Sequence, residues 1–269
     1  MRRTWPAHVT LIAGALVMLA PFVWQLIVSL QTLSDSLRVP PVFVPSWRWE
    51  NFADVFKTVP LGRQFLNTVV VTAAVTAGQL LLCSLAAFAF ARLRFPGRGV
   101  IFMVFLAVLM VPQELFLLPR YEIMLGLGWL NTLQALIAPG VFGAFGTFLL
   151  RQFFLTLPNE LDEAARLDGA SPLQIYWHVM LPLVRPGLLA LGLLSVMWSW
   201  SSLLWPLVVN TDPEQMTLAA GLASLRGQFQ TNFPILFAGS IVASLPVIVL
   251  FVIMQRQLIA GIAFTGTKG

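Results

Sequence analysis

The sequence predicts an all-α protein that crosses a membrane several times. Of its 269 residues, 58% are hydrophobic and only 10% are charged, whereas soluble domains carry about 25% charged residues. The apolar residues are gathered into runs of roughly 20, the length that a helix needs to cross a bilayer. These runs do not alternate as barrel strands do, and an open sheet would leave unpaired backbone groups in hydrocarbon. The predicted fold is therefore six transmembrane helices in a single domain, residues 1–269.

The first apolar run, residues 9–30, follows the basic start MRRTW. A basic start before an apolar run is also typical of a signal peptide. This run, however, is longer than a signal core, lacks a small-residue cleavage pattern at its end and is followed by further spans. We therefore interpret it as the first transmembrane helix, kinked at Pro21.

A mixed segment, residues 31–63, follows the first span. It is too polar to cross the membrane and too aromatic for a plain linker, because the stretch SWRWENF alone holds Trp47, Trp49 and Phe52. Tryptophan is enriched where a membrane meets water. The segment is predicted to lie at the outer surface, where two roles stay open: anchoring among lipid headgroups and contact with a partner.

The later spans are predicted at residues 65–91, 99–118, 132–154, 187–209 and 233–254. If the N-terminus is inside, ten of the sixteen basic residues fall on the cytoplasmic side, as the positive-inside rule expects. These ten are Arg2, Arg3, Arg92, Arg94, Arg98, Arg151, Arg166, Arg185, Arg256 and Lys268. The prediction is a multi-pass protein of the cell membrane with both termini in the cytoplasm.

Prolines and glycines interrupt several of these spans. Pro112 and Pro206 lie in or near the ends of the spans 99–118 and 187–209. In the span 132–154, Gly140, Gly143 and Gly146 are three residues apart, which places them near one helix face and permits close packing. The sequence alone does not separate packing glycines from hinges.

Composition also argues against other classes of protein. The net charge of +5 comes from basic residues dispersed at the ends of apolar runs, so nucleic-acid binding is a poor interpretation. The single cysteine, Cys83, lies inside an apolar run, which leaves no disulfide framework and no metal-ligand spacing. We expect no metal site, and we expect Cys83 to face lipid or a neighbouring helix.

The polar interval 158–186 is the longest one after Gly99, and it is predicted to form a helix-break-helix elbow. Asn159 can cap the first helix, and acidic residues crowd its positive N-terminal end. Gly169 supplies the left-handed residue that ends this helix. In the second helix, Ser171 and Gln174 can form a capping box around Pro172, and Pro182 is expected to end the helix.

The first elbow helix has a surface suited to a partner. Leu161, Ala164 and Ala165 share one face, and Asp162 can pair with Arg166 four residues later. A narrow apolar stripe of this kind can dock into a groove. The alternative is a loop that merely connects two spans.

Several residues of the elbow resemble the EAA loop of bacterial ABC importer permeases: Glu163, Ala164, Ala165, Gly169, Ile175, Leu181 and Pro182. The string EAARLDGAS, together with Gly261 and the C-terminal Lys268-Gly269, most resembles the carbohydrate-uptake branch of that family, and within it the maltose permease G-type subunit. In this family the loop forms a cytoplasmic coupling helix that sits in a cleft of the ATP-binding subunit. The resemblance therefore implies a type I importer permease fold.

The same resemblance implies roles and partners. ATPase coupling would fall to Glu163, Ala164, Ala165, Asp168 and Gly169. The partners would be a second homologous permease subunit, two copies of an ATPase subunit and an extracytoplasmic solute-binding protein. This chain would hold no cofactor and catalyse no reaction, because ATP and Mg²⁺ would bind to the ATPase subunits. The solute would be a carbohydrate or a related polar compound.

Candidate solute contacts come from the stretch MWSWSSLLWP. Trp198, Ser201, Ser202 and Trp205 are spaced three and four residues apart, which predicts one side of a helix. Aromatic faces flanked by hydroxyl groups suit sugar rings. The importer family commonly has Trp-Asn here, whereas this chain has Trp200-Ser201, so helix packing stays open as the alternative.

Gln113 and Glu114, in VPQELFLLPRY, are further candidates for the solute path. Glu114 and Arg120 are the ionisable residues predicted within the membrane, a setting that suggests function. Placement at the interface is the alternative. His8 and His178 lie outside the spans, so no buried proton path is predicted and the energy for transport is expected to come from a partner.

Two other functional classes are alternatives to a permease. A membrane-embedded enzyme would need convergent nucleophiles, bases or metal ligands at membrane depth, and the spans offer none. A scaffold or assembly subunit without a translocation path would use the elbow to bind a partner without any link to transport.

Overall fold

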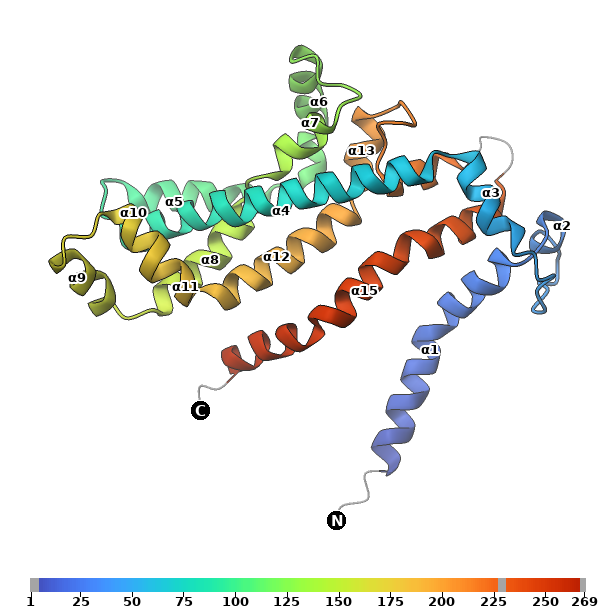
Figure 1. Cartoon of the computed structure of the whole chain (residues 1–269), viewed down its shortest axis with the longest axis horizontal. Coiled ribbons are helices and arrows are strands. Elements are labelled where there is room, and N and C mark those ends of the chain that lie inside the picture. The colour runs from blue at the N-terminus through green and yellow to red at the C-terminus, as the bar shows by residue number, and fades with distance from the viewer. Residues whose placement is uncertain (1–4, 227–230, 267–269) are drawn as a thin grey trace. The chain divides into compact units, whose positions relative to one another are not determined.

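The computed structural model of the chain describes residues 5–226 and 231–266, and within them it is built of helices, apart from one isolated bridge between Arg226 and Thr231 (Figure 1). In chain order the elements are α1 (Trp5–Ser29), α2 (Leu33–Ser36), α3 (Glu50–Thr58), α4 (Leu61–Arg92), α5 (Arg98–Ala107), η1 (Val108–Met110), η2 (Gln113–Phe116), α6 (Leu117–Gly126), α7 (Leu133–Ile137), η3 (Ala138–Gly140), α8 (Ala144–Thr156), α9 (Glu160–Leu167), α10 (Pro172–Gln174), η4 (Ile175–Met180), α11 (Leu181–Leu183), α12 (Arg185–Trp200), α13 (Leu204–Val209), α14 (Leu218–Ser224) and α15 (Phe233–Gly266).

Three stretches of helix within the described residues are long and apolar enough to cross a membrane: His8–Ser29, Leu61–Arg92 and Leu133–Thr156. Two bent pairs of helices raise the number to five if each pair is one span. The helix α15 begins at Phe233, where the last span is expected. The predicted class, an all-α membrane protein, is confirmed.

The segment 99–118 is not the single straight span that the sequence predicts. Helix α5 ends at Ala107, the chain breaks after a short 3-10 turn, and the two halves meet at 97°. Val111 at the break is extended, because the ring of Pro112 disfavours helical geometry in the residue before it. The second half continues through α6 to Gly126.

The segment 187–209 is also divided. Helix α12 ends at Trp200, and Ser201 caps it with its backbone N–H on Met197 O. Pro206 has no N–H and its ring would clash with the carbonyl four residues earlier, so it is tolerated in the first turn of the new helix α13 but not in a continuous helix.

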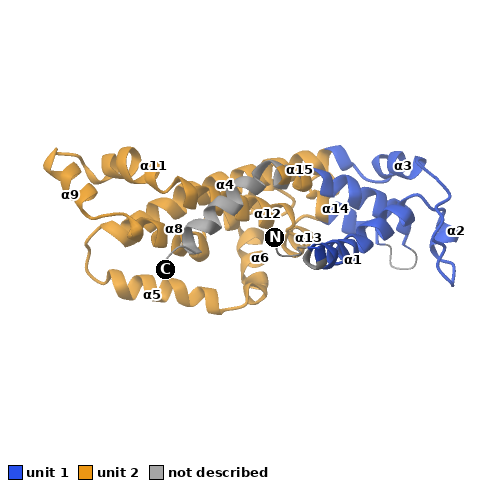
Figure 2. Ribbon diagram, turned by 90° about the horizontal axis from the view of Figure 1, so that it is seen from below, with its two compact units in different colours: residues 1–62, 220–246 blue, residues 63–219, 247–269 orange. Residues whose placement is uncertain are grey.

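The chain divides into two compact units, Met1–Gly62 with Ala220–Pro246, and Arg63–Ala219 with Val247–Gly269 (Figure 2). In the first unit, the buried side chain of Asn51 donates to Ser29 O at 2.8 Å and to Gln31 O at 2.9 Å. The carbonyls at the end of a helix have no partner within it. Asn51, on α3, thus satisfies the end of α1.

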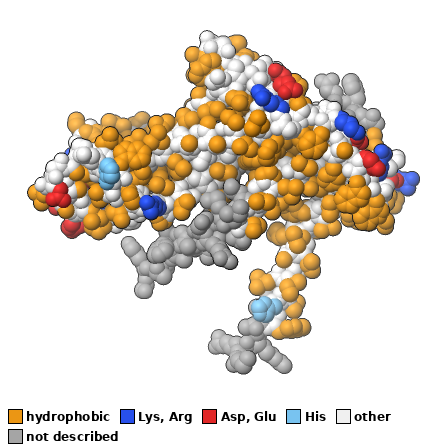
Figure 3. Space-filling view, viewed as in Figure 1, with side chains coloured by type: hydrophobic (Ala, Val, Ile, Leu, Met, Phe, Trp, Pro, Cys, Tyr) orange, Lys and Arg blue, Asp and Glu red, His pale blue; other side chains and the backbone are white. Residues whose placement is uncertain are grey.

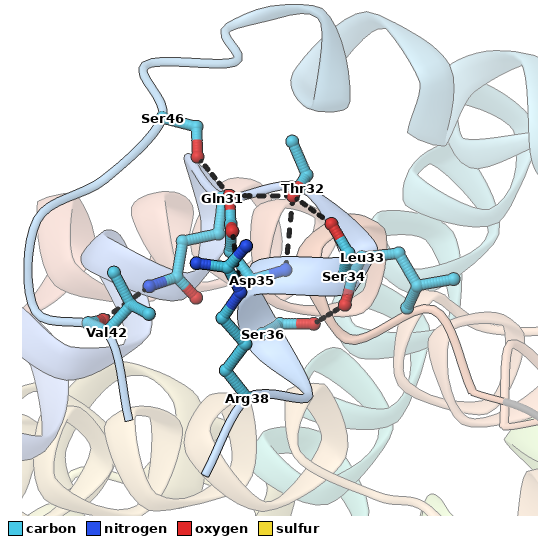
Figure 4. A network of polar contacts seen from close by, with 9 residues as sticks. All are labelled: Gln31, Thr32, Leu33, Ser34, Asp35, Ser36, Arg38, Val42 and Ser46. Carbon is cyan, nitrogen blue, oxygen red and sulfur yellow. Dashed lines mark hydrogen bonds and ion pairs between the residues drawn. The ribbon is translucent and has the colours of Figure 1, made fainter. Parts of the chain in front are cut away.

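A polar network follows α1 in the same unit (Figure 4). The carboxylate of Asp35 accepts hydrogen bonds from Ser46 Oγ at 2.5 Å and from Thr32 Oγ1 at 2.7 Å, and Arg38 lies 3.6 Å away. The hydroxyl donors, Ser46 first, hold the pKa of Asp35 below its ordinary value. Gln31 Nε2 donates to Val42 O at 2.6 Å, so the turn and the following loop are fixed to each other.

The second unit is centred on an apolar cluster that joins α4, α8, η4 and α12. Its aromatic part is Phe88, whose ring lies 5.9 Å from the ring of Phe154 and 5.5 Å from that of Tyr176. Cys83 is buried in this cluster, so of its two expected settings it takes the helix-facing one. The cluster places the elbow directly against the end of α4.

Two of the three glycines expected to permit close packing do so. A Cβ on Gly140 would lie 3.0 Å from Val75, and one on Gly146 would lie 3.0 Å from Cys83 Sγ. Gly143 has no such neighbour, because the chain is extended there between η3 and α8 and the three glycines do not share one helix face.

Helix α4 makes an even closer approach at Gly78, which generates a stability prediction. A Cβ at this position would lie 2.6 Å from Val141 Cβ, which is an overlap. Gly78→Ala is expected to cost about 1–3 kcal/mol of stability and to lower the thermal denaturation midpoint of the purified protein in detergent. Gly62→Ala, on the same helix with no atom within 4 Å, is the control and should have no such effect. Equal midpoints for the two variants would contradict the packing of α4 at Gly78.

Candidate functional site

The elbow predicted over 158–186 is formed as two helical arms around a break. The first arm is α9, and Gly169 after it has φ +82°, the left-handed conformation that the sequence predicts. The second arm opens with the predicted capping box: Ser171 Oγ accepts from Gln174 N, and Gln174 Oε1 accepts from Ser171 N. Asp162 and Arg166 pair at 3.0 Å, also as predicted.

The predicted side-chain cap of α9 is wrong. Asn159 stands at the N-cap position, but its side chain makes no capping hydrogen bond. Its Oδ1 accepts instead from Arg92 Nη1 at 2.6 Å, so an interaction with α4 has replaced the local one. The backbone carbonyl of Asn159 still accepts from the N–H groups of Asp162 and Glu163.

The second arm does not end at Pro182 as the sequence predicts. A π-helical turn, Ile175–Met180, precedes it, and Leu181 N–H donates five residues back to Tyr176 O. Pro182 then stands at the start of α11, where a residue without an N–H is tolerated. The arm ends at Leu183 with Val184 as its C-cap, and the chain bends by 80° into α12, which begins at Arg185.

The apolar stripe predicted on α9 is divided between two surroundings. Ala165 packs against the apolar cluster of the second unit, whereas Leu161 and Ala164 are exposed together with Glu163. Figure 3 shows acidic side chains gathered over α9 on a face that is otherwise largely apolar. The elbow therefore offers a small apolar surface with an acidic border.

An open hollow of about 320 Å³ lies beside α9, and its lining residues are Asp168, Gly169, Ala170, Gln174, His178 and Val179. His178 is exposed, and its Nδ1 lies 3.1 Å from Gln174 O. The hollow is open to the surface and adjoins the end of α9.

Sequence reasoning missed one anchor of the elbow. The hydroxyl of Tyr176 lies 2.6 Å from Ser84 Oγ on α4, and both side chains are buried. The two residues are separated by 92 positions, so no local pattern joins them.

The expected face of Trp198, Ser201, Ser202 and Trp205 is wrong as stated. Trp198 lies on α12, Ser201 at its end, Ser202 in the break and Trp205 on α13, so these side chains do not share one helix. Trp198 packs edge-on against Phe145, with ring centroids 5.2 Å apart. The break leaves Ser201 exposed.

The residues expected near the outer end of 99–118 occupy the second half of the bent pair. Gln113 and Glu114 are exposed on η2, and among the described residues Glu114 has no ion-pair partner. The guanidinium of Arg120 lies over the ring of Trp205 at 5.0 Å. Trp205 is itself fixed, because its Nε1 donates to Ala135 O at 2.9 Å.

A family model for the binding-protein-dependent transport system inner membrane component matches residues 79–263. The match spans the elbow and the candidate solute contacts. It also includes most of α4, the helix that anchors the elbow, from Gln79 onward.

Two relatives match along nearly their whole length. The arabinooligosaccharides transport system permease protein AraQ of Halalkalibacterium halodurans is 35% identical, over 95% of this chain and 93% of the relative. The sn-glycerol-3-phosphate transport system permease protein UgpE of Pectobacterium atrosepticum is 33% identical, over 95% of this chain and 94% of the relative.

A solved structure shows the same fold. It is a bacterial ABC transporter involved in the import of the acidic polysaccharide alginate. Its matching chain has a TM-score of 0.81 at 22% identity, with 93% of this chain and 94% of that chain covered. The predicted type I importer permease fold is confirmed.

The break of the elbow yields a prediction about Gly169. A Cβ there would meet no atom within 4 Å, so Gly169→Ala should act only through the left-handed backbone, at a cost of about 1 kcal/mol. Amide hydrogen exchange over residues 160–174 should become faster in this variant. Gly169→Asn is the matched control, since asparagine enters this conformation more readily, and it should exchange close to the wild type. An alanine variant as protected as the wild type would contradict the assigned turn.

Proposed function

Because this chain belongs to the family of binding-protein-dependent transport system inner membrane components, we propose that it is the permease subunit of an ATP-driven ABC importer. The family that the elbow motif suggested is confirmed. The subunit is a membrane protein whose helices enclose part of a path for the solute. The observation that carries this function is the acidic, partly apolar elbow inside the matched region.

The elbow supports a coupling role for Glu163, Ala164, Ala165, Asp168 and Gly169. Glu163 and Ala164 are exposed, and Ala165 packs inward on the apolar cluster. A partner can therefore touch the outer face of α9 while the inner face stays attached to the bundle. Charge complementarity would favour a basic cleft on the partner, because Glu160 and Glu163 are exposed in the first turn of α9.

We propose the partners that this function requires. They are a second homologous permease subunit, two copies of an ATPase subunit and an extracytoplasmic solute-binding protein. ATP and Mg²⁺ are proposed to bind to the ATPase subunits, which leaves this chain without a cofactor and without a reaction of its own. Exposed apolar side chains along α1 are suited to lipid or to the second permease subunit.

The proposed solute is a carbohydrate or a related hydroxyl-rich compound. AraQ is named for arabinooligosaccharides and UgpE for sn-glycerol-3-phosphate. Both compounds are rich in hydroxyl groups. Trp198, Ser201 and Ser202 stay the proposed contacts on this chain. Exposed Gln113 and Glu114 are proposed to face the path beyond the bend after Val111.

The topology proposed for the subunit places both termini and the elbow in the cytoplasm. In a chain whose buried Cys83 is replaced by alanine, single cysteines at positions 94 and 167 should not react with an impermeant maleimide added to intact cells. Both should react once the cells are permeabilised, since Arg94 and Leu167 are exposed. Labelling in intact cells would reverse the orientation.

The coupling role yields a prediction about Glu163. Glu163→Lys should replace attraction by repulsion at the ATPase contact, a change on the order of a few kcal/mol. The variant should insert in the membrane normally, retain less ATPase subunit on co-purification and lose solute uptake.

Leu173→Lys is the control for added positive charge, because Leu173 is 59% exposed, takes no part in the Ser171–Gln174 capping box and lies outside the proposed contact. Normal uptake and normal co-purification for Glu163→Lys would refute the coupling role. Lost co-purification with normal uptake would instead support a scaffold.

A further inference from the structure

Arg92 is the last residue of α4, and it is only 7% exposed. A charged side chain is seldom buried this far unless specific partners surround it. The neighbouring basic residue Arg94 is exposed. From the sequence, both are expected only as positive charges at the end of a span, so the burial of Arg92 needs its own explanation.

The partners of Arg92 are neutral oxygen atoms at the junction of three segments. Its Nη2 donates to Phe154 O and to Leu157 O, each at 2.6 Å. Its Nη1 donates to Asn159 Oδ1 at 2.6 Å. Phe154 lies in the last turn of α8, where carbonyls lack helical partners and the helix dipole is negative. One guanidinium thus joins the ends of α4 and α8 to the residue before α9.

The contacts of Arg92 depend on the directions in which its guanidinium donates hydrogen bonds more than on its charge. No carboxylate lies within ion-pair distance of Arg92 among the described residues. The planar fork of an arginine can serve two carbonyls and an amide at once, whereas a lysine has one nitrogen on a flexible stem. The contact therefore fixes how α9 leaves α8.

A second contact holds the other arm of the elbow to the same helix. The hydroxyl of Ser84, eight residues before Arg92 on α4, forms a hydrogen bond with the hydroxyl of Tyr176 in η4. The two contacts are about 12 Å apart along α4, given the helical rise per residue. By chain connectivity the elbow is attached only to α8 and α12. Arg92 and Ser84 attach both of its arms to α4 as well.

We propose that Arg92 is a positioning residue for the coupling elbow, which it holds in a fixed direction on α4 and α8. This inference rests on the proposed function. A push on the outer face of α9 moves α4 only if the joint between them is stiff. Without Arg92, α9 would turn about the junction at residues 157–159, and ATP hydrolysis would continue with less solute moved per ATP.

The test uses the complete transporter reconstituted in liposomes, with the loaded binding protein present. Solute uptake and ATP hydrolysis are measured in the same vesicles. Arg92→Ala should assemble and hydrolyse ATP, with uptake per ATP reduced by about tenfold, within the range of ordinary coupling factors. Arg92→Lys should give an intermediate ratio. Arg94→Ala, the control for lost charge, should keep the wild-type ratio.

Asn159 provides a second route if Arg92→Ala fails to assemble. Its side chain is exposed, so folding should tolerate change. Asn159→Leu removes one of the three hydrogen-bond acceptors of Arg92 and should lower the ratio of solute uptake to ATP hydrolysis. Asn159→Asp keeps an acceptor for Arg92 and should preserve the ratio. Equal ratios for the leucine and aspartate variants, or a wild-type ratio in Arg92→Ala, would overturn the proposal.

A distance measurement separates this inference from the proposed function. Spin labels at positions 94 and 167, in a Cys83→Ala background, report the direction of α9 relative to the end of α4. Arg92→Ala should broaden this distance distribution even if the complex proves not to be an importer. An unchanged distribution would refute the positioning role, whereas a wild-type complex that moves no solute would refute only the function.

Discussion

A helix end leaves backbone carbonyls without helical partners, and the rest of this structure depends on how the buried ones among them are satisfied. The breaks around α7 and η3 are served by Gln79, which donates to Gly140 O at 2.9 Å, and by Trp205, which donates to Ala135 O. The end of α8 is served by Arg92. In each case the donor comes from another helix, so satisfying the backbone also ties the helices together.

These ties explain which surfaces of the second unit are left for partners. Gln79 also accepts from Ser195 Oγ on α12 at 2.5 Å, so α4 is joined to η3 and α12 within the bundle. Arg92 and Ser84 join it to the elbow. These inward-facing groups are thereby occupied, whereas Glu163 and Ala164 on the exposed face of α9 remain open to a partner.

The elbow could be predicted from the sequence because its parts are local. The left-handed Gly169, the Ser171–Gln174 capping box and the Asp162–Arg166 pair each depend on residues within four positions of one another. The predicted side-chain cap at Asn159 is wrong because a distant residue competes for it. Its oxygen is taken by a residue 67 positions away, and a single sequence without that contact favours the local hydrogen bond.

The helix breaks were harder to predict than the class of the fold. Apolar residues continue past the breaks at Val111 and Ser201, as LFLL at 115–118 and LLWPLVV at 203–209, so each run reads as one span whether or not it bends. Prolines mark both places, yet Pro21 lies inside the unbroken helix α1. Whether a proline bends, breaks or is tolerated depends on the groups that can satisfy the freed carbonyls, and those groups belong to distant segments.

The break after Trp200 changes which polar groups a solute path in this chain would present to the solute. A continuous helix would present Trp198, Ser201 and Ser202 as a stripe whose backbone is fully bonded. A helix end instead places hydroxyl groups beside carbonyls that have lost their helical partners, and both kinds of group can bind a hydroxyl-rich solute. Trp198 remains on the helix against Phe145, where its ring is held in place. Recognition of polar groups would then come from the break and the apolar contact from the helix, with the second permease subunit completing the enclosure.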